Sequence, residues 1–335
     1  MNIVLDAFGG DNAPISVIKG CLLALDNYRD IKIILSGNKD MLEKIAKENN
    51  LSLSRFEICN AKDIIDVEDN PMEICKSKIL SSMAVGMNLL KKGDGDAFVS
   101  AGSTGALAVG SSLLVGRIKG VKRAALAPVM PSAKGCFMLL DAGANLECRP
   151  EMLLQFAIMG SIYSNKVLGV KNPKIGLANV GAESSKGTEA HKQAYILLKQ
   201  CNYINFIGNV EARDIPFGAC DVVVSDGLSG NMILKTMEGT SNFFVKTLRD
   251  MYMQTNATKI AAALMSKQNR KLKKRMDYTE YGGAVFMGIS QPIIKAHGNS
   301  DANAFKNAIR QARECIKQGV IDEISKNIGS SVGDE

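Results

Sequence analysis

Six short segments rich in Gly, Ser, Asn and Asp follow apolar stretches and have the composition of anion-binding turns. They are DAFGGDNAP (6–14), SAGSTGAL (100–107), DAGANLE (141–147), NVGAESSKG (179–187), SDGLSGN (225–231) and AHGNSDA (296–302). Small residues let backbone N–H groups approach a phosphate, and a helix that begins there adds its positive end. Tight strand-to-helix connections also need glycine, so one such turn alone carries little information. Several turns on one edge of a sheet indicate a phosphate or thioester site.

None of these turns is a standard nucleotide-binding motif. The pattern GxGxxG does not follow the first strand, and GxxxxGK[ST] occurs nowhere in the chain. The segment SAGSTGAL resembles a phosphate cradle, with the hydroxyls of Ser103 and Thr104 at a helix start, but it lacks the lysine of a P-loop. The sequence therefore disfavours a nucleotide ligand and suggests Ser103, Thr104 and Gly105 as a phosphate cradle.

The elements that must position these turns alternate along the chain. Strands are predicted at 2–8, 32–37, 56–61, 96–102, 136–143, 174–181, 204–210 and 221–227, and helices at about 14–27, 39–49, 72–92, 103–116, 150–168, 187–200, 229–253 and 302–325. Short apolar strands between amphipathic helices predict an α/β fold with a mostly parallel sheet covered on both faces. No Pro- or Ser-rich linker divides the chain, so residues 1–335 are interpreted as a single lobed domain. The last residues, 327–335, are expected to fray.

Composition limits the class of protein. The chain has 335 residues, of which 46% are hydrophobic and 22% charged, so a full core is expected. No apolar run reaches the ~18–20 residues that span a bilayer. The segment MNIVLDAFGGD predicts a first strand rather than a signal peptide. The eight cysteines show no metal-ligand spacing and are interpreted as the reduced thiols of a cytosolic protein.

Positive charge is concentrated in KIAAALMSKQNRKLKKR (259–275). Its seven Lys and Arg residues equal the whole excess of 41 basic over 34 acidic residues. Apolar stripes on either side of a turn at 254–258 predict a helical hairpin at about 240–276. One interpretation is two core helices with a solvated basic face. The other is a surface for anionic lipid or an acidic protein, in which apolar residues at the tip dip into a bilayer surface. Nothing in the pattern indicates nucleic acid.

Seven co-linear motifs together resemble the phosphate acyltransferase family of bacterial phospholipid synthesis. They are DAFGGDNAP, SAGSTGALAVG, LLDAGANLECRPEMLLQFA, FIGNVEARD, SDGLSGNMILK, YGGAVFMG and IKAHGNSDA, from residue 2 to about 310. The resemblance implies the conversion of long-chain acyl-(acyl carrier protein) and inorganic phosphate into acyl phosphate. It also implies a three-layer fold like that of isocitrate and isopropylmalate dehydrogenases, a homodimer, and a peripheral contact of the hairpin with the inner face of the cell membrane. The product would pass to a membrane glycerol-phosphate acyltransferase.

This chemistry explains why no protein nucleophile is visible. Inorganic phosphate is itself the nucleophile, and a thiolate is a good leaving group because a cysteine thiol has a pKa of about 8.5. The protein has to hold the anion beside the thioester carbonyl and stabilise the oxyanion, for which amides, a lysine, an asparagine and a histidine suffice. No metal ion or redox cofactor is expected.

Three side chains are the catalytic candidates. Lys186 lies in a Gly-flanked turn where a cation can pair with phosphate, although a solvated surface lysine fits as well. Asn231 is placed to donate to a carbonyl oxygen, with a helix N-cap as the alternative. His297 is one of two histidines and either donates to phosphate or thiolate or satisfies local backbone. The predicted substrate-binding residues are Gly9, Gly10, Gly102, Ser103, Thr104, Gly105, Asn145, Asp226, Gly227 and Gly230, with Asp226 expected to orient a neighbour or a backbone turn. The predicted membrane or partner contacts are Tyr252, Met253, Ile260, Leu264, Lys267, Arg270, Lys271, Lys273 and Lys274.

Three further readings stay open at this stage. A phosphotransacetylase acting on short acyl-coenzyme A would use the same chemistry. A non-catalytic protein that binds lipid surfaces would use the hairpin alone. A nicotinamide-dependent decarboxylating dehydrogenase would need a cluster of metal-binding aspartates, whereas the acids of this chain are scattered among its turns.

Overall fold

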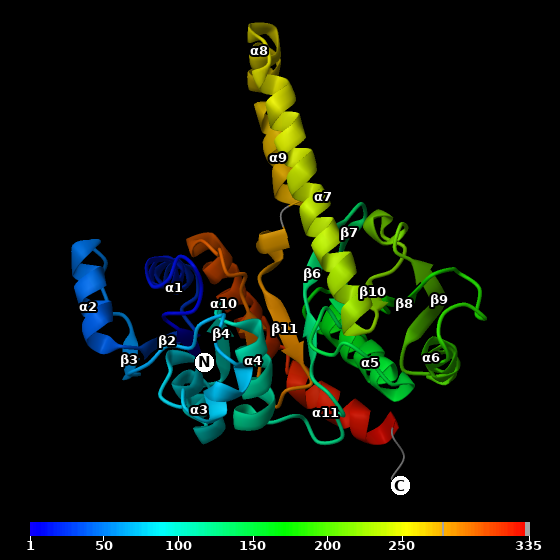
Figure 1. Cartoon of the computed structure of the whole chain (residues 1–335), viewed down its shortest axis with the longest axis horizontal. Helices are drawn as coiled ribbons and strands as arrows, with labels where there is room; N and C mark the ends of the chain where they lie inside the picture. Colours follow the sequence, from blue (N-terminus) through cyan, green and yellow to red (C-terminus); the bar gives the residue numbers. More distant parts are fainter. Residues whose placement is uncertain (277, 332–335) are drawn as a thin grey trace.

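Two sheets lie side by side in the computed structural model (Figure 1), which describes residues 1–276 and 278–331, with side chains except at 274, 275, 278, 279 and 329–331. The first sheet has the order β3 (Glu57–Asn60), β2 (Lys32–Gly37), β1 (Asn2–Asp6), β4 (Ala97–Ser100), β12 (Ile293–Lys295), β11 (Ala284–Met287) and β5 (Ala125–Ala127). The second has the order β6 (Val129–Ser132), β7 (Gly135–Leu140), β10 (Val222–Val224), β8 (Lys174–Asn179) and β9 (Asn205–Glu211). Neighbours are parallel except for β11 with β5 and β12, and β6 with β7.

All eight predicted strands are present, but the expectation of one sheet is wrong. The strands that sequence reasoning missed are the short β5, β6, β11 and β12, and they build the junction between the two sheets. The chain leaves the first sheet at Ala127 and enters the second at Val129, on either side of Pro128. Proline lacks the N–H that a central ladder needs, so it is suited to this crossing point.

Helices cover both sheets, with α1 (Ile15–Asn27), α2 (Lys39–Glu48), α3 (Ser82–Lys92) and α4 (Thr104–Gly110) around the first and α5 (Pro150–Lys166) and α6 (Glu189–Gln200) around the second. The predicted helix at 72–92 is interrupted. A 3-10 helix covers Pro71–Cys75, and α3 begins only after Ser81, whose hydroxyl accepts from the N–H of Ala84. The helix α4 continues as a π-helical turn at Ser111–Val115.

The predicted helix at 302–325 is two helices, α10 (Ala302–Lys317) and α11 (Val320–Ser331). The chain turns between them at Gly319, where φ is +61°, a conformation that favours glycine. Because α11 runs to Ser331, the predicted fraying is wrong up to that residue, and residues 332–335 lie outside the described part. All eight cysteines are free thiols in the structure.

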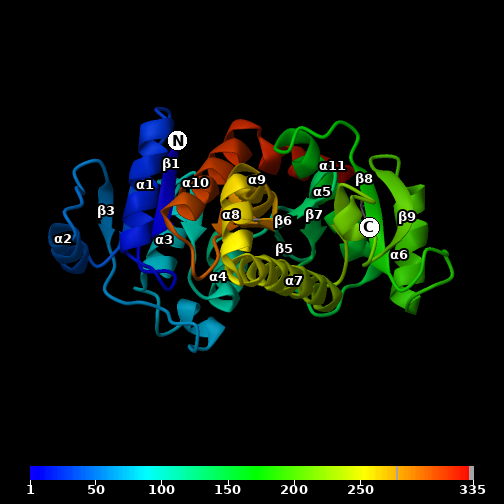
Figure 2. The same ribbon diagram turned by 90° about the horizontal axis from the view of Figure 1, so that it is seen from above.

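One apolar cluster joins the two sheets into a common core. It contains Leu5 and Val99 from the first sheet and Met138 and Val224 from the second, all 0% exposed. Figure 2 shows α10, α11 and α5 on one side of the two sheets and α7 (Gly227–Met253) on the opposite side.

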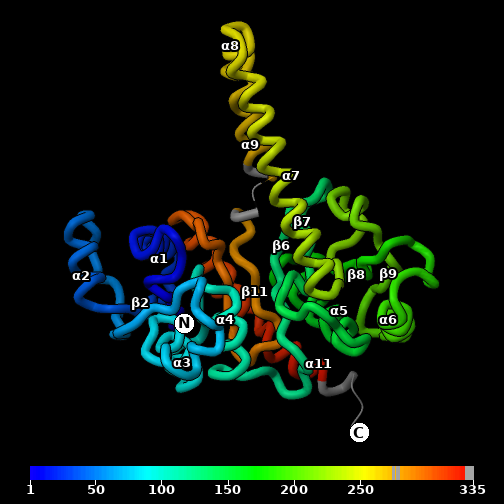
Figure 3. The backbone as a smooth tube through the Cα atoms, in the orientation of Figure 1, coloured from blue at the N-terminus to red at the C-terminus, as the bar shows by residue number. Residues whose placement is uncertain are grey.

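The helical hairpin projects from the body (Figure 3). Its first arm is α7, and its second arm is α8 (Asn256–Leu264) followed by α9 (Ser266–Met276). The predicted turn at 254–258 is present, since α7 ends at Met253 and Thr255 caps α8. No residue of α8 is buried, and the residues of α7 that are buried, Gly227, Gly230 and Leu234, all lie near its first turns. The interpretation as two core helices is therefore wrong. None of the described helices is both long and apolar enough to cross a membrane.

Candidate functional site

Four hollows lie around the turns that follow the parallel strands, and two of them share a wall. The central cavity, of about 320 Å³, is lined by Thr104, Leu126, Pro128, Val129, Met130, Ala142, Gly143, Asn231, Leu234, Lys235, Glu238, Gly282, Gly283, Ala284, Lys295, Ala296, His297, Gly298, Ser300 and Ala304. The glycine cavity, of about 320 Å³, is lined by Phe8, Gly9, Gly10, Asp11, Ile64, Ile65, Asp66, Val67, Ala101, Gly102, Ser103, Thr104, Lys295 and Gly298. These two share Thr104, Lys295 and Gly298 as a common wall.

Two more hollows flank the central cavity. The basic cavity, of about 330 Å³, is lined by Met72, Ala108, Val109, Ser112, Leu113, Arg117, Arg123, Ala124, Ala144, Asn145 and Phe286. The side cavity, of about 660 Å³, lies against α6 and the start of α7, and its wall includes Gly187, His191, Asp226 and Met232. Five of the six predicted turns border the central or the glycine cavity. The turn at 179–187 borders only the side cavity, where it meets the turns that follow the parallel strands β7 and β10.

Close backbone packing explains two of the glycines. A Cβ atom on Gly230 would lie 1.9 Å from the carbonyl oxygen of Asp141, and one on Gly9 would lie 2.5 Å from Oδ2 of Asp6. Neither position tolerates a side chain without moving the neighbouring backbone or carboxylate. Glycine therefore lets α7 begin directly against the turn that follows β7, and lets the turn after β1 lie against β4.

Asp141 organises the turn after β7. It is 0% exposed, and its carboxylate accepts from the N–H groups of Leu126 at 2.9 Å, Ala144 at 3.0 Å and Asn145 at 2.7 Å. Burial raises the pKa of this carboxyl group, while these hydrogen bonds oppose the rise. The amides of this turn are thus directed at Asp141. Both N–H groups of the Asn145 side chain are engaged too, with Ala124 O at 2.7 Å and with Asp141 at 2.8 Å.

Lys295 stands on the wall between the central and glycine cavities. Its ammonium donates to the carbonyl oxygen of Ala101 at 2.8 Å and to that of Gly102. Burial lowers its pKa to about 8, partly opposed by the carboxylates of Asp6 and Asp11. An ammonium has three N–H donors, so two carbonyls leave one donor for a ligand.

Asp6 is the buried counter-charge at the end of β1. Its carboxylate accepts from the hydroxyl of Ser82 at 2.6 Å and from that of Ser100 at 2.7 Å. Burial raises the pKa of Asp6. These hydrogen bonds and the charge of Lys295 oppose this rise without cancelling it. The side chains of β1, α3 and β4 are thereby linked beneath the glycine cavity.

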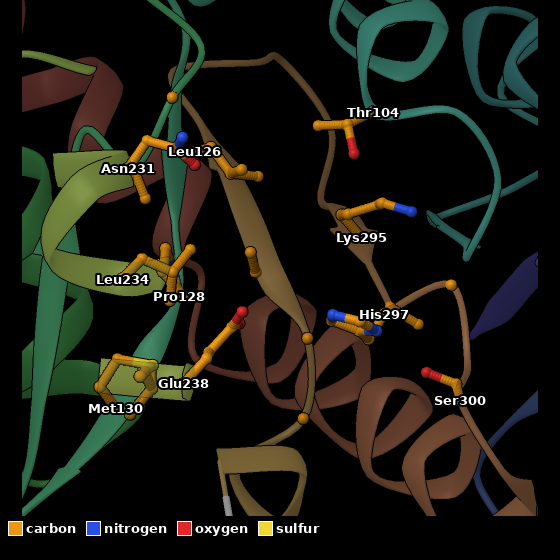
Figure 4. A pocket seen from close by; sticks show the side chains of 18 of the residues that line it. Thr104, Leu126, Pro128, Met130, Asn231, Leu234, Glu238, Lys295, His297 and Ser300 are labelled. Carbon is orange, nitrogen blue, oxygen red and sulfur yellow. The ribbon is translucent and has the colours of Figure 1, made fainter. Parts of the chain in front are cut away.

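Across the central cavity, side chains of the two sheets face each other (Figure 4). Asn231, Leu234 and Glu238 come from α7, while Thr104 begins α4, Lys295 ends β12 and His297 lies in the turn after β12. Asn231 is the fifth residue of α7, and Asp226 is the N-cap, so the interpretation of Asn231 as an N-cap is wrong. The structure brings the predicted Asn231, His297 and Thr104 together around one space.

Lys186 is not in this group. It is exposed in the turn after β8, where its N–H donates to Glu183 O at 3.1 Å, and it lies beside Gly187 on the side cavity. Asp226 borders the same cavity. Its carboxylate accepts from the N–H of Ser229 at 2.8 Å, as expected for a residue that orients a backbone turn, and lies 3.7 Å from Nε2 of His191.

Of the other predicted binding residues, Gly9, Gly10, Gly102 and Ser103 line the glycine cavity, with Ser103 capping α4. Gly105 packs against Pro71, and Gly227 donates to Asn145 O at 2.7 Å.

The hairpin exposes both charge and apolar surface. Leu264 is 79% exposed, Ile260 63% and Met253 59%, which is unusual for such side chains on a helix. Tyr252 instead joins the two arms, because its hydroxyl donates to Oδ1 of Asn269 at 3.3 Å. Lys267, Arg270, Lys271 and Lys273 are exposed, while the side chain of Lys274 lies outside the described residues.

Sequence reasoning missed Lys295, Asp6, Asp141 and Glu238 as parts of the site. A signal existed for three of them, since Asp6, Asp141 and Lys295 stand in the motifs DAFGG, DAGANLE and IKAHG. Lys295 was passed over because β12 was not predicted, so its place at the end of a strand was hidden. Glu238 lies in none of the motifs. It is part of α7, and only the path of that helix brings it to the central cavity.

Comparison with known proteins decides the family. The family model described as "Fatty acid synthesis protein" matches residues 1–323. A phosphate acyltransferase of Thermoanaerobacterium thermosaccharolyticum is 48% identical over 335 residues, covering 100% of this chain and 98% of that protein. The chain belongs to the phosphate acyltransferase family. A member from Clostridium botulinum (strain Loch Maree / Type A3) is 46% identical, with 99% of each chain covered.

Solved structures agree with the fold expected of this family. A phosphotransacetylase from Streptococcus pyogenes superposes with a TM-score of 0.65 at 17% identity, covering 95% of this chain and 94% of that one. A branched-chain phosphotransacylase from Enterococcus faecalis V583 gives a TM-score of 0.58 at 13% identity, covering 94% and 99%. At such low identity the likeness establishes the shared three-layer α/β fold, as predicted. The assignment to the phosphate acyltransferase family identifies the protein as an acyltransferase enzyme, as the sequence motifs predicted.

Proposed function

We propose that this acyltransferase makes acyl phosphate from a long-chain acyl-(acyl carrier protein) and inorganic phosphate in the central cavity. A phosphate oxygen attacks the thioester carbonyl carbon, the carbonyl electrons move onto oxygen, and the oxyanion collapses as the carbon–sulfur bond breaks. The thiolate leaves and takes up a proton. The observation that carries this proposal is the position of Lys295, on a wall that faces both a glycine-lined hollow and an apolar one.

Phosphate is assigned to the glycine cavity, against Lys295 and Thr104. The free N–H of the Lys295 ammonium and the Thr104 hydroxyl then direct an oxygen of the anion toward the central cavity. The carboxylate of Asp6 balances part of the lysine charge. The acids Asp11 and Asp66 also border this cavity, so we assign them the outer rim, where water separates them from the anion.

The thioester is assigned to the central cavity. Asn231 and His297 face the common space there and supply donors for the carbonyl oxygen, whose negative charge grows in the transition state. One such donor contributes about 3–4 kcal/mol, and alignment of the two reactants about 7–11 kcal/mol. The apolar wall formed by Leu126, Pro128 and Leu234 receives the start of the acyl chain.

The hairpin is assigned to the anionic inner face of the cell membrane. The exposed Leu264, Ile260 and Met253 near its tip suit shallow insertion, and each basic residue near an anionic surface adds about 1 kcal/mol. We further propose a homodimer and delivery of acyl phosphate to a membrane glycerol-phosphate acyltransferase, which would limit hydrolysis of this reactive product in water.

The test is to incubate the purified protein with phosphate and a long-chain acyl-(acyl carrier protein), and to trap acyl phosphate with hydroxylamine. Formation of acyl hydroxamate that depends on phosphate is expected. The fold is also that of phosphotransacetylases, so acetyl-coenzyme A is assayed in parallel. Activity with acetyl-coenzyme A alone would make the protein a phosphotransacetylase, and trapping of an acylated side chain would refute direct attack by phosphate.

A further inference from the structure

A second basic segment, besides the hairpin, lies on the body of the protein. The loop RIKGVKR (117–123) carries four positive side chains, and the chain has no acidic residue between Asp96 and Asp141. These four side chains, Arg117, Lys119, Lys122 and Arg123, are all exposed, whereas Ile118 and Val121 between them are buried. None of the four forms an ion pair with a residue that the structure describes. The loop therefore presents uncompensated positive charge.

The loop is held in a fixed conformation from below. The side chain of Gln155, which is 1% exposed, donates to Gly120 O at 2.8 Å and accepts from the N–H of Lys122 at 2.9 Å. Arg117 forms an isolated backbone bridge with Ile289, and its guanidinium donates to Lys122 O. A charged loop that is ordered before binding loses little conformational entropy when a partner docks.

The basic cavity opens beside this loop. Its wall combines Arg117 and Arg123 with the exposed Leu113 and Met72, and none of the described residues that line it carries a carboxylate. Arginine beside exposed apolar side chains is a composition typical of protein-binding surfaces.

Three elements line the basic and the central cavities in succession. The helix α4 has Thr104 on the central cavity and Ala108 on the basic one. At β5, Leu126 borders the central cavity and Ala124 the basic one. In the turn after β7, Gly143 borders the central cavity and Ala144 the basic one. A slender arm entering between the arginines is thus guided along α4 to the space that Asn231 and His297 face.

We propose that the loop 117–123 and the basic cavity dock an acidic carrier protein, whose thioester-bearing arm enters the central cavity through the basic cavity. This inference rests on the proposed function, because it names the surface that receives the proposed substrate. Electrostatic complementarity here steers the encounter, while the arm carries the reacting group to a site that the carrier itself does not enter.

A membrane is a poorer fit to this loop. Gly120 lies against Ile328 of α11, on the side of the body away from the tip of the hairpin at α8 (Figure 1). One flat bilayer does not contact both places, and the hollowed shape of the basic cavity suits a convex protein surface. The two basic segments of the chain then have different partners, the hairpin a lipid surface and the loop 117–123 a protein.

The test compares two variants with equal changes of charge. Lys119→Glu and Lys122→Glu reverse the two exposed lysines of the loop and keep Arg117 and Arg123, which line the basic cavity. Lys267→Glu and Lys271→Glu reverse two exposed lysines of α9. The Kd for a long-chain acyl-(acyl carrier protein) is measured by titration calorimetry, and kcat/KM is measured with this substrate and with the corresponding acyl-pantetheine, which lacks the protein.

The loop variant should raise the Kd for the carrier at least tenfold and lower kcat/KM for it by a similar factor, with kcat/KM for acyl-pantetheine and binding to anionic vesicles unchanged. The α9 variant should leave carrier binding unchanged.

Three results would each overturn the proposal. They are equal carrier affinity in the loop variant and the wild type, weaker carrier binding in the α9 variant alone, and weaker vesicle binding in the loop variant. If the reversed loop does not fold, the Lys119→Gln and Lys122→Gln variant should still weaken carrier binding. A wild type that binds the carrier through the loop but forms no acyl phosphate would refute the proposed function and leave the docking surface in place.

Discussion

The ammonium group of Lys295 donates a hydrogen bond of 2.8 Å to the carbonyl oxygen of Ala101, in the turn after β4. This bond joins β12 to the glycine-rich turn of its neighbour, and it fixes a cation where two hollows meet. Burial of the ammonium lowers its pKa to about 8, so its charge is open to titration just above neutral pH.

The first prediction concerns pH. The kcat/KM for phosphate should fall as pH rises through about 8, because the neutral amine no longer attracts the anion. The Lys295→Arg variant should lose this falling limb, since a guanidinium stays charged above pH 12. The Lys295→Met variant should raise the KM for phosphate by two orders of magnitude or more. Initial rates at varied phosphate and pH provide the measurement.

Stability supplies the control for this lysine. Because the pKa of Lys295 is lower in the folded protein, the unfolded chain binds more protons between about pH 8 and 10.5, and folding gains stability as pH rises through that window. The buried charge opposes folding at pH 7, but its removal leaves Asp6 and two carbonyls without their partner, so the unfolding temperature of Lys295→Met is measured to show that this variant is folded under assay conditions. Normal phosphate kinetics in this folded variant would remove Lys295 from the mechanism.

A pair of glycines on α7 tests the packing at the start of that helix. Gly230→Ala should lower the free energy of unfolding by about 1–3 kcal/mol, because its Cβ would overlap the carbonyl oxygen of Asp141. Gly239 lies on the same helix with nothing within 4 Å of its Cβ, so Gly239→Ala should raise that free energy by about 0.5–1 kcal/mol. Denaturant titrations measure both changes. Equal effects would show that the close approach to Asp141 is not maintained in solution.

Asn231 tests oxyanion stabilisation. Asn231→Ala should lower kcat about 10²–10³-fold, because a donor to the developing oxyanion is lost. Asn231→Asp has nearly the same shape but offers only acceptors, so it should be at least as slow. Single-turnover rates at saturating phosphate isolate the chemical step. A fully active aspartate variant would show that the side chain positions the substrate by shape alone.

Local patterns predicted the strands that carry the turns, because each is an apolar run ending in small residues. They did not predict the junction, since β5, β11 and β12 have three or four residues each and give no periodic signal. The motif IKAHG drew attention to His297, yet Lys295 acquires its role from two carbonyls that are 193 and 194 residues away in the chain. The loop 117–123 was hidden for another reason. Its charge cancels in the overall sum, and only its exposure and its place beside a cavity distinguish it.

Lys186 remains a prediction of the motif comparison. Lys186→Ala should lower kcat strongly, if the side cavity takes part in binding substrate, while the free energy of unfolding changes by less than about 0.5 kcal/mol because the side chain is exposed. Lys192→Ala, an exposed lysine on the adjacent α6, is the matched control and should be silent. Full activity of the Lys186 variant would remove this residue from the catalytic candidates.

The hairpin prediction separates charge from apolar contact. Lys267→Glu, Lys271→Glu and Lys273→Glu should abolish binding to vesicles that contain anionic lipid, and the wild type should lose binding as salt rises, because the attraction is screened. Leu264→Ser and Ile260→Ser should weaken binding at every salt concentration, since apolar burial is not screened by ions. Vesicle co-sedimentation measures both, and acyl-pantetheine turnover should stay at the wild-type value in all variants because α8 and α9 contribute no residue to the central cavity. If the serine variants bind as well as the wild type, the exposed tip does not enter the bilayer, and the hairpin contacts lipid through charge alone.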